Sequence, residues 1–367
     1  AHARGRADRG GLEQARRVAA DLGRQLSGGT PQRVPRESAA DPGTLLAFAY
    51  PDRIGRRRAG GEGRFTLANG RGAAFAAPQS LARSEFIVAV DVDDRDRDAR
   101  ILLAAPLERA ALTAHFSERI RQVDAVAWSA REQAVTARRT LLFDQLVLEE
   151  QPLAEPEPQA VLHAMLAGVG ELGIAALPWD RDARDLQARV AFLRGAAVAG
   201  SQSRGAWPDL TDEALAATLD TWLAPWLAGV TRREQLARVP LPRALGAQLS
   251  FEQQRALERE APTHLTVPSG SRIRIDYQGD DAPAVAVRLQ EVFGLEASPR
   301  LGPNHVPVTF RLLSPAQRPV QVTRDLASFW RGAYAEVRRQ LRGRYPRHYW
   351  PENPLAAQPA RGVPRRR

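Results

Sequence analysis

The C-terminal stretch at residues 318–354 reads RPVQVTRDLASFWRGAYAEVRRQLRGRYPRHYWPENP. It opens with Val320-Gln321-Val322, whose alternation is typical of a short strand. Thr323 then occupies an N-cap position, where its hydroxyl can accept from the first free N–H groups of a helix. Gly343 predicts the end of that helix, and Pro346 prevents it from resuming. Apolar residues recur every three or four positions on one predicted face: Leu326, Phe329, Trp330, Ala333, Tyr334, Val337 and Leu341.

Arginines form a second stripe on the same predicted helix. Its members are Arg324, Arg331, Arg338 and Arg342, and a basic aromatic run follows, Arg344-Tyr345-Pro346-Arg347-His348-Tyr349-Trp350. The apolar face is typical of core packing. The arginine face has two interpretations. It is the solvated face of a docking helix, or it is a phosphate-contacting surface with aromatic rings nearby that can stack on bases.

The composition excludes several kinds of chemistry. The chain has 367 residues, of which 44% are hydrophobic and 26% charged, a globular balance that suggests two or three domains. It contains no Cys, which excludes disulfides, thiol catalysis and cysteine zinc sites. All 52 basic side chains are Arg, so neither a G-x-x-x-x-G-K-[ST] phosphate loop nor a Schiff-base lysine can exist here. No apolar run reaches membrane-spanning length, and we expect a soluble protein without a membrane partner.

Positive charge gathers at both ends of the sequence. The net charge is +6 over residues 1–64, −5 over residues 65–317 and +9 over residues 318–367. Concentrated charge indicates a polyanionic partner, and nucleic acid fits better than a membrane because no amphipathic helix with an exposed bulky apolar face is evident. The chain starts at Ala1 without a signal-peptide pattern, and we expect it to be part of a longer protein.

The first third of the chain predicts a helix and then a small barrel. Apolar spacing predicts a helix over residues 10–27, and a Gly-, Pro- and Ser-rich linker follows to residue 43. Short strand-like runs over residues 44–113, with a glycine-hinged turn at Asn69-Gly70, predict a small β-barrel. The acidic run at 91–98 lacks the Gly and Glu of a calcium loop, so it reads as a solvated loop between strands.

The middle of the chain, residues 114–260, predicts a β-meander followed by helices. Three strand-like runs lie at Val123–Trp128, Glu132–Arg139 and Leu141–Leu148, and the proline-rich segment 151–158 closes them. Residues 159–260 read as mainly helical. Thr211 is a predicted N-cap, and Ser250 with Gln253 has capping-box form.

Residues 261–354 predict a mixed α and β domain. We expect strands at Arg272–Tyr277 and Val306–Leu313, with a helix at Ala284–Phe293 between them that Gly294 ends. The basic tail at 355–367 is expected to be disordered. The predicted fold class is therefore α+β and multi-domain, with a small barrel, a helical middle and a mixed C-terminal domain.

Catalytic patterns are weak. The sequence has no G-x-S-x-G elbow and no histidine pair at metal-binding spacing, and we expect no catalytic, cofactor or metal site in this segment. His264 stands in the run THLTVPSGS with Ser269 and Ser271, which allows a hydrolase interpretation, but a braced strand and turn explain it better. Ser269 and Arg272 could also grip a phosphate together with the backbone N–H groups around Gly270.

Several longer stretches resemble one family. PTHLTVPSGSRIRIDY (262–277), AVRLQEVFGL (286–295) and residues 312–354 together resemble the C-terminal domain of HrpB-type bacterial ATP-dependent RNA helicases. Upstream, LLAFAYPDRIGRRR (45–58) and GRFTLANGRGAAF (63–75) resemble the oligonucleotide-binding barrel that follows the motor in DEAH-type helicases. The helix near the N-terminus would then end a helical ratchet-like domain at residues 1–43.

The resemblance implies a cytoplasmic helicase and nucleoside-triphosphate hydrolase whose motor, with its ATP and Mg²⁺, lies upstream of this segment. The segment would guide or clamp RNA, or single-stranded DNA, for that motor. The alternative is a regulatory module whose basic surfaces dock the motor domains or an acidic partner. The arginines predicted to contact nucleic acid are Arg53, Arg56, Arg57, Arg58 and Arg71 in the barrel, and Arg324, Arg331, Arg338, Arg342, Arg344 and Arg347 at the C-terminal end.

Overall fold

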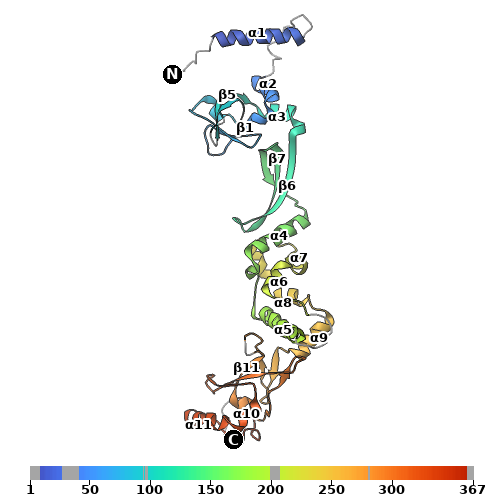
Figure 1. The fold of residues 1–367 in the computed structure, drawn as a ribbon, viewed down its shortest axis with the longest axis vertical. Coiled ribbons are helices and arrows are strands. Elements are labelled where there is room, and N and C mark those ends of the chain that lie inside the picture. Colours follow the sequence, from blue (N-terminus) through green and yellow to red (C-terminus); the bar gives the residue numbers. More distant parts are fainter. Residues whose placement is uncertain are drawn as a thin grey trace. The chain divides into compact units, whose positions relative to one another are not determined.

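The computed structural model describes residues 9–26, 41–93, 95, 98–198, 207–279 and 282–361 (Figure 1). The chain divides into two compact units. Unit 1 comprises residues 1–124 and 138–152, and unit 2 comprises residues 125–137 and 153–367. We describe each unit by itself.

The N-terminal element of unit 1 is helix α1 (Arg9–Leu26), which confirms the predicted helix. Val18 and Leu22 on this helix are each 52% exposed. The predicted linker falls largely on residues 27–40, which lie outside the described residues.

A closed five-stranded barrel forms the centre of unit 1. Its strand order is β1-β2-β3-β5-β4, and all neighbours are antiparallel except the parallel pair β3 and β5. Gly70 has a φ of +85° in the turn between β2 and β3, a conformation that glycine adopts without strain, and this turn was predicted. The strands are β1 (Ile54–Arg57), β2 (Arg64–Leu67), β3 (Gly72–Phe75), β4 (Phe86–Asp93) and β5 (Asp98–Leu107).

Two apolar clusters fill this unit. One cluster, with Phe65, Ile87 and Ile101 among its members, lies between the barrel strands. The other joins strand residues such as Phe86 to Phe116 and Phe143, which lie outside the barrel strands. The short helices α2 (Pro42–Ala49) and α3 (Arg109–His115) flank the barrel in sequence. The barrel that the sequence predicted is therefore confirmed, with its core on alternate strand positions.

A three-stranded sheet in the order β6-β7-β8 follows, and it confirms the predicted meander. Its strands are β6 (Ile120–Ser129), β7 (Ala134–Phe143) and β8 (Leu146–Pro152). The second turn lies at Asp144-Gln145, with Asp144 at a φ of +49°, and not near Thr140 where the sequence placed it. Thr140 is instead paired with Glu150 inside the ladder.

The helical part of unit 2 begins with α4 (Pro158–Leu172), whose N-cap Glu157 accepts from the N–H groups of Gln159 and Ala160. Both predicted caps are confirmed, because Thr211 accepts from Ala214 N and Ser250 with Gln253 forms a capping box. The remaining helices are α5 (Arg181–Val198), α6 (Asp212–Ala217), α7 (Leu219–Trp222), α8 (Leu241–Gly246) and α9 (Phe251–Glu260).

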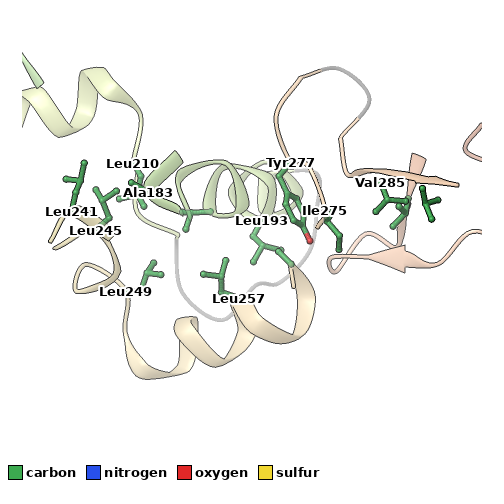
Figure 2. Close-up of a cluster of buried hydrophobic side chains, with 14 of the residues drawn as sticks. Ala183, Leu193, Leu210, Leu241, Leu245, Leu249, Leu257, Ile275, Tyr277 and Val285 are labelled. Atoms are coloured by element: carbon green, nitrogen blue, oxygen red, sulfur yellow. The ribbon is translucent and has the colours of Figure 1, made fainter. Parts of the chain in front are cut away.

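One apolar cluster joins these helices to the α+β part of unit 2 (Figure 2). Leu241 and Leu245 of α8 lie near Leu210, Leu257 of α9 lies near Leu193 of α5, and Val285 of a strand belongs to the same cluster. Because a shared core is not easily divided, the helical and the α+β parts of this unit form one folded body.

The α+β part corrects one prediction. Residues 284–293 are not a helix, because β11 (Ala284–Arg288) pairs in parallel with β14 (Thr309–Leu313) and a 3-10 turn at Leu289–Val292 follows. A short apolar run cannot be assigned by periodicity alone, and here the sheet supplies the partner. The other strands are β9 (His264–Thr266), β10 (Arg272–Arg274), β12 (Arg300–Leu301), β13 (Val306–Pro307) and β15 (Pro319–Thr323).

The C-terminal helix is also different from its prediction, since it consists of two helices, α10 (Leu326–Arg331) and α11 (Tyr334–Arg344). Gly332, with φ −117° and ψ −84°, separates them and leaves Ala333 exposed. The other six residues of the predicted apolar face are buried, as expected.

The caps of these two helices were also placed wrongly. The N-cap is Asp325, which accepts from Ser328 N at 3.0 Å, and not Thr323. Helix α11 continues through Gly343 to Arg344. Of the predicted tail, residues 355–361 are described and residues 362–367 lie outside the described part.

Candidate nucleic-acid interface

Strand β1 carries the predicted barrel arginines past an open hollow of about 600 Å³. Arg56 donates to the carbonyl of Val147 and lies 3.8 Å from the Glu85 carboxylate. Arg58 donates to Thr66 Oγ1 at 3.1 Å and faces Asp98 at 3.4 Å. The Arg57 side chain is exposed and has no hydrogen bond or ion pair with any residue that the structure describes. Of three adjacent arginines, the middle one is therefore available to a ligand.

Two more barrel arginines were predicted to bind. Arg53 donates to the carbonyl of Val90 at 2.8 Å and its guanidinium lies 5.3 Å from the centre of the Tyr50 ring. These contacts fix its side chain against the barrel. Arg71 is exposed after the β2–β3 turn, and its backbone N–H donates to Asn69 Oδ1 at 3.0 Å.

In unit 2 the predicted arginines separate into anchored and exposed ones. Arg338 donates to the carbonyl of Trp350 and to Glu352, both at 3.1 Å, so it ties α11 to the segment that follows it. Arg324 donates to Thr309 Oγ1 at 3.1 Å, and Arg331 donates to Ser328 Oγ at 3.3 Å. The predicted stripe of four arginines is therefore interrupted both by the break in the helix and by these contacts.

Three arginines at the end of α11 remain exposed. Arg342, Arg344 and Arg347 form no hydrogen bond or ion pair within the described part of the chain. Arg342 also lines an open hollow of about 610 Å³ with Arg338, Arg339 and Pro346. Guanidinium groups that keep all five donors free suit phosphate oxygens.

The turn around Gly270 is occupied by internal hydrogen bonds. Ser269 N donates to the carbonyl of Glu291 at 3.2 Å, Gly270 N donates to Val267 at 2.8 Å, and Ser271 N donates to Ser269 Oγ at 3.3 Å. These N–H groups are therefore engaged, which argues against a phosphate cradle of backbone N–H groups at Ser269. Arg272 is exposed on β10 and has no polar partner among the described residues.

The hydrolase interpretation finds no nucleophile–base pair. His264 Nδ1 lies 3.0 Å from Thr263 Oγ1, and Ser269 Oγ donates to Glu291 at 3.1 Å instead of to a histidine. Within the described ranges, no group of His, Asp and Glu side chains is arranged to hold a metal ion. The helices of that part of the chain also include none that is long and apolar enough to cross a membrane.

The sequence did not lead us to predict that Arg189 is buried. Arg189 on α5 is 5% exposed, donates to the carbonyl of Ala261 at 2.6 Å and pairs with Glu258 at 2.6 Å. Its signal was a charged residue next to the apolar positions Val190 and Leu193 of the same helix. Such an arginine joins two helices and is unavailable to a ligand.

The sequence also did not reveal the partner of His348. His348 Nδ1 lies 3.1 Å from Gln290 Oε1, while Gln290 Nε2 donates to the carbonyl of Tyr349 at 3.1 Å. Burial, and then the nearby Arg288 charge, lower the pKa of His348 below its usual range. The aromatic run that contains His348 is visible in the sequence, but its partner Gln290 lies 58 residues away.

Comparison with known proteins places these features in a family context. Residues 222–354 match the family described as ATP-dependent helicase C-terminal (HrpB_C), and residues 119–153 match the family described as ATP-dependent RNA helicase HrpB, connector region. The chain is 41% identical over 307 residues to the ATP-dependent RNA helicase HrpB of Escherichia coli K12, covering 83% of this chain and 37% of that protein. The chain therefore spans about 37% of the length of the curated relative that it matches.

One solved structure gives the same relationship, and a second is similar in sequence. A crystal structure of the E. coli DExH-box NTPase HrpB has 37% sequence identity and a TM-score of 0.54, and it covers 97% of this chain and 42% of its own. A second, of the E. coli DEAH/RHA helicase HrpB, has 38% identity and a TM-score of 0.48, covering 84% of this chain and 38% of its own.

Proposed function

The chain carries the connector and C-terminal regions of the HrpB helicase family, and on that premise we propose that it binds RNA for an ATP-driven motor elsewhere in the same protein. The observation that carries this proposal is that several of the predicted arginines are exposed and have side chains without a partner in the described residues. They are Arg57 in unit 1 and Arg272, Arg342, Arg344 and Arg347 in unit 2. Phosphate contacts of this kind position a nucleic acid without reading its sequence.

The barrel supports the same role. Its five strands close in the order β1-β2-β3-β5-β4 with one parallel pair, an arrangement that suits an oligonucleotide-binding fold. We therefore assign it as an OB-fold, with Arg57 at the open hollow as its phosphate contact. Arg56 and Arg58 would hold β1 in place beside it.

The reaction itself belongs to the rest of the protein in this proposal. The relative is named as an ATP-dependent RNA helicase, and ATP with Mg²⁺ would bind in its motor, upstream of this segment. The segment would guide or clamp the RNA strand and would not be catalytic. A bacterial helicase of this kind would work in the cytoplasm.

The test is a salt titration of RNA binding by this chain. We expect the logarithm of the association constant to fall linearly with the logarithm of the salt concentration, with a slope of about −0.7 per neutralised phosphate of a single strand. A triple variant, Arg342→Gln, Arg344→Gln and Arg347→Gln, should reduce that slope by about 2.

A matched control removes the same charge elsewhere in unit 2. Arg238, Arg243 and Arg255 are also exposed, and their triple change to Gln should leave the slope unchanged. Equal losses in both triple variants would mean that only the total charge matters. An absence of binding in the wild-type chain would refute the proposal and favour a protein-docking role.

Docking is a second candidate because of two exposed apolar side chains. Leu45 and Phe48, three residues apart on α2, are 58% and 55% exposed. A shared exposed face on a short helix is typical of a contact with another protein surface. Changing both to Ser should then weaken association with the motor domains and leave RNA binding by this chain unchanged.

A further inference from the structure

A ring of contacts in unit 2 joins three segments that are far apart in the sequence. Arg288 Nη1, at the end of β11, donates to the carbonyl of Arg361 at 3.2 Å. The neighbouring Ala360 N donates to the carbonyl of Gln290 at 3.0 Å, and the Gln290 side chain contacts His348. The Arg288 charge acts on His348, which closes the ring. The fold thus brings the Arg288 guanidinium to the backbone of Arg361 and within electrostatic reach of the His348 imidazole.

The hydrogen bonds of Gln290 fix the tautomer of His348. Gln290 is 2% exposed, and its Nε2 donates to the carbonyl of Tyr349, so its Oε1 can only accept. His348 Nδ1 must then carry the proton that this oxygen accepts. His348 Nε2 is left as an acceptor in the neutral ring and becomes a donor when the ring is protonated.

Both arginines have N–H groups that donate to no described residue. Arg288 Nε is buried and has no hydrogen-bond partner among the described residues, an arrangement that costs free energy unless a ligand or water completes it. Arg361 uses Nε on the carbonyl of Ser269 at 3.1 Å and is otherwise exposed. Arg288 therefore retains an Nη2 group, without a partner in the described residues, that can donate to an anion, whereas the Arg361 guanidinium is held at the Ser269 carbonyl.

The acid of this region does not neutralise the pair. Glu291 is 7% exposed, and its Oε2 accepts from Ser269 Oγ at 3.1 Å. No ion pair joins Glu291 to either arginine in the described part of the chain, and Tyr345 and Trp350, which flank the His348 ring, carry no charge. Two positive charges against one negative charge leave the ring of contacts with an excess that attracts an anion.

We propose that Arg288 and His348 form a phosphate-binding site, which holds a phosphoryl group of the RNA strand. This site rests on the proposed RNA-binding function and gives it a second, defined contact apart from the exposed arginines of α11. A guanidinium group suits the geometry of phosphate oxygens, and a protonated His348 would add a further donor through Nε2. Since a bound dianion favours the charged imidazole, phosphate binding should be coupled to protonation of His348.

The first test uses inorganic phosphate and the histidine resonances of the full chain by NMR. The chain has six His, and a His348→Gln variant identifies the signal of residue 348. We expect saturating phosphate to raise the pKa of His348. In Arg288→Gln, the pKa of the free ring should rise because a nearby positive charge is gone, and phosphate should no longer shift it. An unchanged His348 titration at saturating phosphate in the wild-type chain would overturn the site.

The second test uses RNA strands that carry either a 5′-phosphate or a 5′-hydroxyl. Arg288→Gln should weaken binding by about tenfold or more, the loss expected for a charged hydrogen bond. Arg300→Gln is the matched control, because Arg300 is an exposed arginine of the same unit whose Nη1 also donates to a carbonyl, that of His305 at 3.0 Å. A preference for the 5′-phosphate would identify a terminal monoester as the ligand, and equal affinities would identify an internal diester.

The outcomes separate the two proposals. RNA binding that weakens equally in Arg288→Gln and Arg300→Gln would overturn this site and leave general RNA binding intact. Failure of the wild-type chain to bind RNA, together with a His348 response to inorganic phosphate, would refute the RNA-binding function and restrict the site to small phosphates. Correct folding of each variant is checked by the near-ultraviolet circular dichroism of the tryptophans.

Discussion

Two arginine-rich segments of the molecule have similar sequences and opposite roles in the structure. In the barrel segment, Arg53, Arg56 and Arg58 are held by carbonyls, a hydroxyl or carboxylates, and Arg57 alone is open. In α11 and the residues just after it, the open arginines are the majority. Arg338 and Arg339 are held by the Trp350 carbonyl and by Glu336, and Arg342, Arg344 and Arg347 are open.

The difference follows from the two backbones. Several strands lie close to β1 and Arg58, so that the Val147 carbonyl of β8 and the Asp98 side chain of β5 are within reach of Arg56 and Arg58. Helix α11 has such neighbours in its middle, where Trp350 and Glu352 meet Arg338, but the arginines of its last turn, Arg342 and Arg344, have none among the described residues. An arginine therefore becomes structural or available according to what its backbone places beside it.

The largest loss of stability is expected at Arg189, which is 5% exposed. Arg189→Met should destabilise unit 2 by about 2–3 kcal/mol, because the carbonyl of Ala261 loses a charged donor, while the mostly exposed Glu258 carboxylate loses little. Chemical denaturation measures this loss. The control Arg259→Met, on an arginine that is exposed and paired with its neighbour Glu260, should change the stability by less than about 0.5 kcal/mol.

The next effect separates folding from binding within α11. Arg338→Ala should cost about 1–2 kcal/mol, because the carbonyl of Trp350 loses its donor, and it should leave the salt dependence of RNA binding unchanged. Arg342→Ala should do the opposite, reducing the salt slope by about 0.7 and leaving the stability within about 0.5 kcal/mol. Denaturation and binding measured on both variants would show whether anchored and open arginines differ as described. Equal effects of the two changes on binding would contradict the distinction.

A smaller contrast is expected in the barrel. Arg58→Ala should destabilise unit 1 by about 1 kcal/mol through the lost bonds to Thr66 and Asp98, both of them partly exposed to solvent. Arg57→Ala should leave the thermal midpoint almost unchanged and weaken RNA binding. If Arg57→Ala proves the more destabilising of the two, then Arg57 has a structural role that its exposure does not reveal.

The smallest effect is a pH dependence at a paired arginine. Hydrogen bonding from Arg184 is the largest cause that lowers the pKa of Asp212 below its usual 3.8. A carboxyl with a lowered folded-state pKa contributes stability above about pH 4, and this contribution is lost as the pH falls through the folded-state pKa. The free energy of unfolding of Asp212→Asn should therefore depend less on pH in this acidic range than that of the wild-type chain, as measured by denaturation at several pH values. An unaltered pH profile would mean that the pair adds nothing to stability.

Elements with strong local patterns were predictable from the sequence. The barrel strands, the meander, and the caps at Thr211 and Ser250 each depend on neighbours within a few residues. The predicted helix at 284–293 was wrong because the partner of β11 lies on β14, more than twenty residues later. The break at Gly332 was missed since the apolar spacing continues across it from Trp330 to Tyr334.

The candidate site was less predictable than the fold. Arginine positions are visible in the sequence, but their partners are not. Arg338 and Arg342 are four residues apart in one apparent stripe, and only the contact with Trp350 distinguishes them. The ring of Arg288, Gln290, His348 and Arg361 required contacts between segments separated by as many as 73 residues. Local patterns carry no information about such distant contacts.

The closed barrel limits where the protein can self-associate through its strand edges. Closure pairs every strand of the barrel on both sides, so the barrel offers no free row of N–H and C=O groups for a strand from another molecule. The sheet β11-β14-β15 in unit 2 is open, and its outer strand β15 begins with Pro319, which cannot donate to an added strand, but continues to Val322, whose side chain is half exposed. Self-association on heating should therefore begin at β15 of unit 2, and a charged side chain at Val322 should delay it.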